Sequence, residues 1–343
     1  MSTLTVPAAA TARPAVSPPG RTRAGALRAG RSAVGIIAQA AATLLIASFV
    51  TFALGALSGS DPAAVALGDM ATPEDVARLN REFGLDRPLL VRYIDWLTSA
   101  AVGDLGRSWF TGIPVADSVA AAFPVSLSIA LGATVVATIA GGATGILAAV
   151  RRGTWIDRAI TGVNAGLATI PAFVAGIVLI LIFGFAVPIL PVGGYVPPEV
   201  SVFAWLTCLV LPSIALSLDA ASDLSRQLRT SLVGALGQNY IVGATVHGLS
   251  GARIVWGHAL PNALGPAVAT LGLHVPRLVG GAVITEAVFG MPGLGQLARQ
   301  SAVSGDVPVV QGVLLVSVVL VVVSGVVVNL VLARVSTTDR SAA

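Results

Sequence analysis

Three ionisable residues in a long apolar stretch are the first candidates for chemistry in this chain. His274 and Arg277 are three positions apart and would share one face of a helix, whereas Glu286 lies nine positions beyond Arg277 and would point elsewhere. Each is a candidate for function because burying a charge in lipid is costly. Arg277 could attract a carboxylate that passes along its face, or it could pair structurally with Asp219, with Asp223 or with a group on a partner chain. Both interpretations of Arg277 are open at this point.

Motifs of enzymes and of metal sites are missing from the sequence. It contains neither an HExxH metal motif nor a GxSxG nucleophile turn. A Walker A loop needs a lysine that reaches the phosphates of ATP, and all 20 basic residues of this chain are arginine. The single cysteine, Cys208, excludes an intramolecular disulfide and a cysteine metal site. We therefore predict no catalytic residue, no metal site and no cofactor on this chain, so that any ATP would be bound by a separate subunit.

The elements that carry these residues are predicted to be transmembrane helices. Of the 343 residues, 55% are hydrophobic and 10% are charged, and the mean hydropathy of +0.88 is too high for an ordinary soluble domain. A helix that crosses a ~30 Å hydrocarbon core needs about 20 apolar residues. Charge-free runs of this length predict an all-α polytopic membrane protein with six transmembrane helices, within residues 32–60, 118–150, 159–198, 200–218, 254–276 and 307–333.

The first of these runs could instead be a signal peptide. It is longer than the roughly 7 to 15 apolar residues of a signal-peptide core, so we expect an uncleaved helix. The predicted organisation is a disordered cytoplasmic tail at 1–31, a first transmembrane helix at 32–60, an extracytoplasmic helical loop at 61–117, a transmembrane core at 118–335 and a cytoplasmic tail at 336–343.

The distribution of arginine predicts the orientation in the membrane. Thirteen of the 20 arginines lie in the two tails and in the second and fourth connections between the predicted helices. Cytoplasmic segments carry such an excess, so both termini are expected in the cytoplasm. This bias also accounts for the isoelectric point near 10.2. Nucleic-acid binding is not predicted, because it would need a basic face on a water-exposed domain.

A short polar segment at residues 239–261 has the composition of a helix that docks on a soluble partner. Such a helix needs a few apolar anchors, small residues for close approach and polar flanks. Gly243 and Gly248 permit close backbone approach and a change of direction. A connecting loop without any partner is the alternative. The candidate anchors are Tyr240, Ile241, Ala244, Leu249 and Ile254.

The order of residues from Asn239 to Gly295 resembles the permease subunits of ABC importers, in the dipeptide, oligopeptide and nickel branch. In that superfamily a cytoplasmic loop carries Glu-Ala-Ala, three residues, Gly, nine residues and then Ile-x-Leu-Pro, and it docks on the ATPase subunit. The matching positions here are Ala244, Gly248, Leu260 and Pro261, and the departures are at Val242, Gly243 and His258.

The resemblance implies a bundle like that of the type I ABC importer permeases and a set of partners. These are a second homologous permease, two ATP-binding subunits that hold ATP and Mg, and an extracytoplasmic binding protein that delivers peptides or a related small solute. The location implied is the bacterial inner membrane, crossed several times. Similar permeases carry a glutamate at the Glu286 position. The residues implied for ATPase coupling are Tyr240, Ile241, Ala244, Gly248, Leu249, Leu260 and Pro261.

The sequence of the loop at 61–117 also resembles that of the corresponding loop in this importer branch. Thr72 is a candidate N-cap for a helix that stops near Gly84, and a second short helix is expected over about residues 88–100. The loop could meet the binding protein or could cap the bundle, and both interpretations are open.

An ion-coupled secondary transporter is the rival class of function. It would need a relay of carboxylates or histidines at the membrane midplane and internal repeats, and the sequence shows neither clearly.

Overall fold

The computed structural model describes residues 38–39, 41–55, 62–68 and 71–341, with side chains up to residue 331. The chain divides into two compact units, Met1–Ala42 and Thr43–Ala343, and every contact discussed below lies within the second. The predicted tail at 1–31 lies outside the described residues. The described part of the first predicted span is a shorter apolar helix, Ala41–Gly55.

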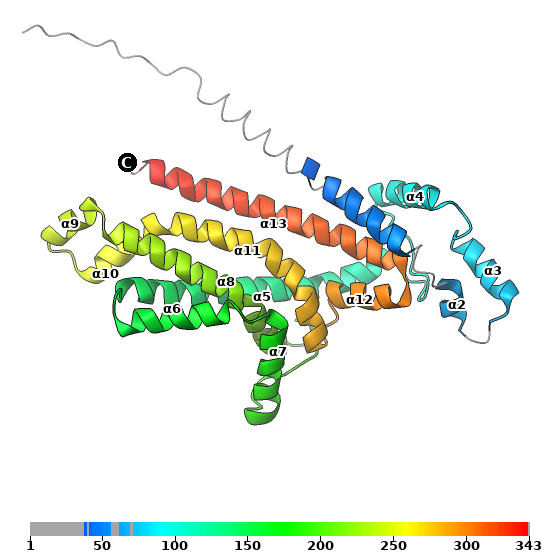
Figure 1. Ribbon diagram of the computed structural model, residues 1–343, viewed down its shortest axis with the longest axis horizontal. Coiled ribbons are helices and arrows are strands. Elements are labelled where there is room, and N and C mark those ends of the chain that lie inside the picture. Colours follow the sequence, from blue (N-terminus) through cyan, green and yellow to red (C-terminus); the bar gives the residue numbers. More distant parts are fainter. Residues whose placement is uncertain (1–37, 40, 56–61, 69–70, 342–343) are drawn as a thin grey trace, which may run out of the picture. The chain divides into compact units, whose positions relative to one another are not determined.

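Four long helices form the bundle shown in Figure 1: α5 (Val115–Val150), α8 (Val202–Leu236), α11 (Leu260–Phe289) and α13 (Val307–Ser341). α8 packs against α5 and α11, and α11 packs in turn against α13. The apolar core lies where α5, α8 and α11 meet, around Ile129, Leu211 and Phe289. The all-α prediction is confirmed for the part of the chain described, in which two residues form an isolated bridge but no strand is present.

Small residues let α5 and α8 approach closely. A Cβ added at Gly141 would lie 2.5 Å from the carbonyl oxygen of Ala221, and one added at Gly145 would lie 2.8 Å from that of Ser225. Membrane helices associate through such small-residue faces because lipid supplies no hydrophobic drive between them. Gly142, one position away, has open space at its Cβ position.

The third predicted span is two helices rather than one. α6 (Trp155–Leu167) and α7 (Ala172–Leu181) are bent by 102° at a short break. Pro171 directly precedes α7. It favours a break here because proline lacks the N–H that a continuous helix would need. A π-helical turn, Ile182–Ala186, extends α7. The described residues therefore contain four helices long and apolar enough to span a membrane, or five if the bent pair is one span, in addition to Ala41–Gly55.

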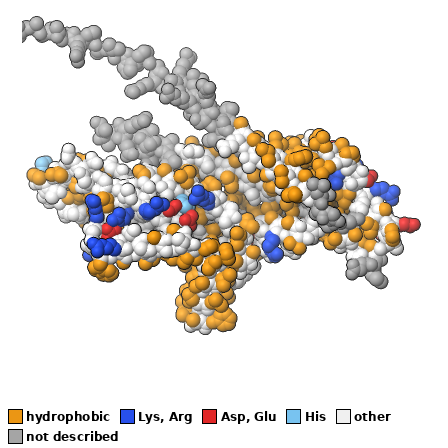
Figure 2. Space-filling model, in the orientation of Figure 1, with side chains coloured by type: hydrophobic (Ala, Val, Ile, Leu, Met, Phe, Trp, Pro, Cys, Tyr) orange, Lys and Arg blue, Asp and Glu red, His pale blue; other side chains and the backbone are white. Residues whose placement is uncertain are grey.

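The surface around α7 is almost wholly apolar, while charged side chains gather elsewhere on the same face (Figure 2). Phe185 is 81% exposed and Leu181 is 54% exposed. Such a patch on a water-exposed surface would be a liability, and its natural environment is lipid or another membrane helix.

The described residues of the segment at 61–117 include three short helices: α2 (Pro62–Leu67), α3 (Pro73–Glu82) and α4 (Leu89–Ala101). The helices predicted near 73–84 and 88–100 are confirmed. Thr72 Oγ1 accepts a hydrogen bond from the backbone of Asp75, and Gly84 has a positive φ of 67° just after α3. At its end this segment is joined to the start of α13, because Ser108 Oγ donates to Asp306 Oδ2 over 2.5 Å.

Candidate functional site

The segment at 239–261 folds as a short helix, a turn and a second short helix. α9 (Asn239–Val246) is followed by Gly248, whose φ of 77° lies in the left-handed region that favours glycine. α10 (Gly251–Ile254) continues through a π-helical turn, Val255–Ala259, directly into α11. Residues 251–289 are thus one continuous helical path that joins this turn to the interior of the bundle.

Two of the predicted anchors face the chain itself. Ile241 and Ile254 are each only 7% exposed and pack in a cluster with Leu228 and Leu232 of α8. Ala244, Leu249 and Leu260 are partly buried against the same cluster. These side chains hold the segment on its own helices. Pro261 is exposed in the first turn of α11.

Other residues of the segment expose apolar side chains. Tyr240 is 44% exposed, Val242 61%, Val246 78% and Trp256 62%. These four residues are candidates for docking on a partner, and we call them the apolar docking face. Sequence reasoning selected only Tyr240 among them, although Val242 and Val246 are four positions apart and so share one helical face. A Cβ added at Gly243 or Gly248 would meet no heavy atom within 4 Å, so both backbones are open to a partner.

Glu286 is fully buried near the end of α11 and accepts hydrogen bonds from two other helices. Ser126 Oγ on α5 donates to its Oε1 (2.5 Å). The backbone N–H groups of Gly295 and Gln296 donate to its Oε2 (2.8 and 3.2 Å). These two residues open α12 (Leu294–Ser304), where N–H groups lack partners within the helix and a negative charge is favoured. Glu286 therefore caps α12 and joins it to α5 and α11.

The approach of Glu286 to α12 depends on a glycine. A Cβ added at Gly293 would overlap the carboxyl group of Glu286. The backbone N–H of Leu294 completes the cluster by donating to Ser126 Oγ over 2.8 Å. The sequence alone did not indicate which group Glu286 bonds.

His274, rather than Arg277, contacts Asp219 and Asp223. It is 4% exposed on α11, and its Nε2 lies 3.1 Å from Asp223 Oδ2 while its Nδ1 lies 3.6 Å from Asp219 Oδ2. Both carboxylates belong to α8. Arg277 is exposed and forms no hydrogen bond or ion pair with another residue that the structure describes.

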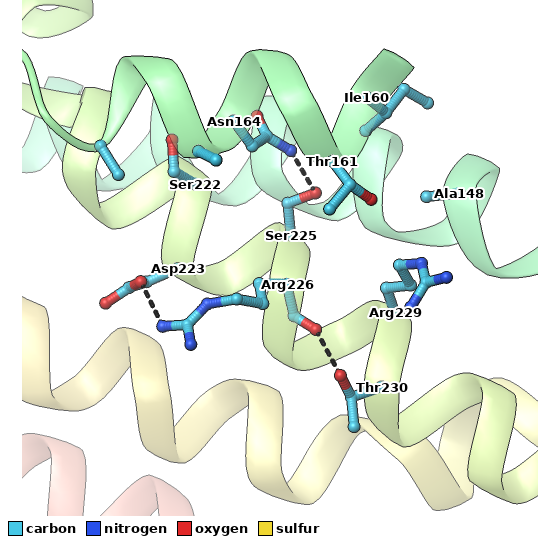
Figure 3. A pocket seen from close by; sticks show the side chains of 12 residues that line it. Ala148, Ile160, Thr161, Asn164, Ser222, Asp223, Ser225, Arg226, Arg229 and Thr230 are labelled. Atoms are coloured by element: carbon cyan, nitrogen blue, oxygen red, sulfur yellow. Dashed lines mark hydrogen bonds and ion pairs between the residues drawn. The ribbon is translucent and has the colours of Figure 1, made fainter. Parts of the chain in front are cut away.

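Asp223 also lines a cavity of about 250 Å³ between α6 and α8 (Figure 3). Arg226 donates to Asp223 over 2.7 Å, and Asn164 of α6 donates to Ser225 over 2.8 Å. Arg229 lines the same cavity.

Arg229 also ties α8 to the start of α6. Its Nε and Nη2 donate to the two oxygens of Asp157 over 2.6 and 2.7 Å. The partners are 72 positions apart, so sequence reasoning missed this pair. No group of three or more His, Cys, Asp or Glu side chains is placed to hold a metal ion within the described ranges.

Comparison with known proteins identifies the family. The model of the binding-protein-dependent transport system inner membrane component matches residues 141–337, and the N-terminal model of that system matches residues 31–130. A putative peptide transport system permease protein of Brucella abortus is 35% identical over 279 residues, which is 81% of this chain and 89% of that protein.

Two further relatives are named for other solutes. The metal-staphylopine import system permease protein CntB of Staphylococcus aureus is 30% identical over 82% of this chain and 88% of its own length. The glutathione transport system permease protein GsiC of Escherichia coli is 33% identical over 80% of this chain and 87% of its own length.

A solved structure shows the same fold. It is an inward-facing conformation of the MetNI methionine ABC transporter, with a TM-score of 0.52 and 20% identity, and the match covers 63% of this chain and 95% of that one. Family, relatives and fold agree with one another and do not favour a secondary transporter. The chain belongs to the family of binding-protein-dependent transport system inner membrane components, and it is a transmembrane permease subunit of an ATP-driven ABC importer.

Proposed function

We propose that this chain forms one half of a translocation pathway for peptides or a related small solute. A second homologous permease forms the other half, and an extracytoplasmic binding protein delivers the solute. Two separate ATP-binding subunits hold ATP and Mg, while this chain is not an enzyme and binds no cofactor. The names of the relatives support the solute class, since two of them concern peptide and glutathione transport.

The apolar docking face carries the proposal. Tyr240, Val242, Val246 and Trp256 present exposed apolar surface on a short helical segment that is held from behind by buried Ile241 and Ile254. A helix laid in a groove of a soluble partner uses such anchors. The motif positions Gly248, Leu260 and Pro261 then serve as turn and hinge between this face and α11.

The continuous path from α10 to α11 suggests how ATP would act on the pathway. Closure of the ATP-binding subunits displaces the docking face, and the π-helical turn Val255–Ala259 passes this displacement to α11. α11 carries His274, whose partner Asp223 lies on α8, and Glu286, whose partners lie on α5 and α12. ATP must bind one conformation of the complex more tightly than the other, because otherwise it shifts no equilibrium.

The exposed charges of α8 and α11 are the candidates for contact with the solute. Arg277 is exposed without an ionic partner in the described part of the chain, and Asp219 is 56% exposed beside His274. We place Arg277 along the pathway, where its guanidinium attracts the carboxylate of a peptide. Glu286 and His274 have buried structural contacts and position the helices around it.

The test is uptake by the reconstituted complex together with a variant of the docking face. Val246→Asp places a charge on the most exposed of the four residues, and we expect less ATP-binding subunit to copurify and ATP-driven uptake to fall about tenfold or more. The matched control is Val102→Asp, because Val102 is 84% exposed in the segment at 61–117. Uptake driven by a pH gradient without ATP would instead support secondary transport. Equal ATP-driven uptake and equal copurification in the two variants would contradict the role of the docking face.

A further inference from the structure

A cavity of about 210 Å³ lies where α4, the helix Ala41–Gly55 and the start of α13 meet, away from the residues of the proposed pathway. Aromatic rings line it: Phe52, Phe83, Trp96 and Trp109. Phe83 and Trp109 are stacked, with centroids 5.3 Å apart and planes 15° apart. A cavity of roughly 150 Å³ is enough to bind benzene. The available space therefore suits a group with one ring or a branched aliphatic side chain.

Two buried polar atoms of residues that line this cavity lack a hydrogen-bond partner among the described residues. One is the indole Nε1 of Trp96, which can only donate, and the other is Oε1 of Gln311, which can only accept. Gln311 is fully buried and is held by its other amide atom, since Nε2 donates to the carbonyl of Ser48 over 2.8 Å. An unpaired buried polar group is costly. Both atoms are closed off from the cavity, so they gain a partner there only when their side chains shift towards a ligand.

The charges at the cavity favour an anion. Arg87 pairs with Asp95 over 2.7 Å at the solvent-exposed side. Arg92 also lines the cavity and rests on the ring of Phe52 at 5.4 Å, but it forms no hydrogen bond or ion pair with another described residue. Burial lowers the pKa of Arg92, and the charge of Asp86 partly opposes this effect. The guanidinium is thus partly desolvated and retains free donors.

These features together specify the chemistry of a ligand. We propose that the cavity binds the last residue of a peptide with an aromatic or branched aliphatic side chain. The carboxylate meets Arg92, and the side chain enters the ring-lined space. Once their side chains shift towards the ligand, the indole N–H of Trp96 donates to the carboxylate and Gln311 Oε1 accepts from the amide N–H. The choice of a peptide rests on the proposed function, whereas the complementarity rests on the cavity itself. An N-acyl amino acid offers the same groups.

The experiment is calorimetric titration of the full complex in lipid nanodiscs, without ATP, using N-acetyl-phenylalanine as the probe. We expect saturable binding that weakens about fivefold or more for N-acetyl-phenylalaninamide, which lacks the carboxylate, and for 3-phenylpropionate, which lacks the N–H donor. Gly-Gly-Phe distinguishes the two sources, because a peptide ligand must bind at least as well as the single residue. Weaker binding of Gly-Gly-Phe would overturn the peptide assignment.

Variants locate the binding. Arg92→Gln is expected to weaken binding about tenfold and Gln311→Leu about fivefold. Arg81 is exposed on α3 and does not line the cavity, so Arg81→Gln should leave binding unchanged. The proposal fails if no probe binds saturably, if all probes bind alike, or if Arg92→Gln behaves as Arg81→Gln does. ATP-driven uptake is measured separately, so intact uptake without binding would overturn this inference alone, and binding without ATP-driven uptake would overturn the proposed function alone.

Discussion

Single buried side chains join the helices of this permease, and Glu286 is the clearest case. Its carboxylate accepts three hydrogen bonds from two other helices, and it has no exposed surface. Arg277 lies nine positions earlier on the same helix and is exposed without an ionic partner among the described residues. Burial and partners therefore separate two charged residues of one helix into a structural role and a candidate pathway role.

Replacing Glu286 by Gln is expected to destabilise the complex. The amide keeps the shape but removes the negative charge that accepts from the N–H groups of Gly295 and Gln296, and it forces Ser126 Oγ to accept rather than donate. We expect a cost of about 1 to 3 kcal/mol. The measurement is the thermal midpoint of the purified complex. Glu82→Gln at an exposed position is the control, and equal midpoints for the two variants would contradict the capping role.

Replacing Arg277 by Gln tests the pathway. No carboxylate of this chain pairs with Arg277 in the described ranges, so we expect the thermal midpoint and basal ATPase activity of the complex to be preserved. Uptake of peptides with a free carboxylate should fall about fivefold or more relative to amidated peptides, since one charge-assisted contact is lost. A destabilised complex that transports both kinds of peptide equally would instead indicate pairing with the second permease.

At the scale of whole helices, individual glycines allow close packing. Gly141 lies against the backbone of α8, while Gly142 faces open space on the same helix. The same contrast applies to the two sides of the segment at 239–261, where α9 buries Ile241 and exposes Val242. α5 and α9 thus each have one face packed within this chain and another that is available to lipid or to a partner.

Gly141→Ala and Gly142→Ala form a matched pair for the contact between α5 and α8. The first would place a Cβ 2.5 Å from the carbonyl oxygen of Ala221, and overpacking of this kind costs about 1 to 3 kcal/mol. The second meets no neighbour within 4 Å and should be neutral or stabilise the helix slightly. The thermal midpoints of the two complexes provide the comparison. A Gly141→Ala complex as stable as Gly142→Ala would show that the helices separate easily.

The whole molecule is built for an asymmetric environment. α7 presents exposed apolar side chains, and charged side chains gather elsewhere (Figure 2). We propose on the arginine distribution that both termini and the docking face are cytoplasmic, with the segment at 61–117 on the opposite side. The cavity at Arg92 would then open to the side from which the solute arrives.

Labelling of single cysteines measures this orientation. In a chain with Cys208 replaced, cysteines at Ser250 and at Thr72 should react with an impermeant thiol reagent from opposite faces of the membrane. Both positions are exposed, at the starts of α10 and α3. Reaction of both from one face would overturn the proposed orientation.

Composition and local signals by themselves determined the class of this protein and most of its elements. Long charge-free runs predict membrane helices because lipid tolerates few charges, and the capping residue Thr72 predicts the start of α3 because its oxygen accepts a free N–H of the first turn. The order and spacing of Ala244, Gly248, Leu260 and Pro261 resemble those of the importer family, to which the chain belongs.

Tertiary structure decided which residues meet. The break of 102° between α6 and α7, the partners of His274 and Glu286, and the pair of Asp157 with Arg229 all depend on contacts between distant segments. Helical periodicity shows that residues share a face but does not tell which neighbour covers that face. For this reason Ile241 and Ile254, chosen as anchors for a partner, pack against α8, while Val242, Val246 and Trp256 remain exposed.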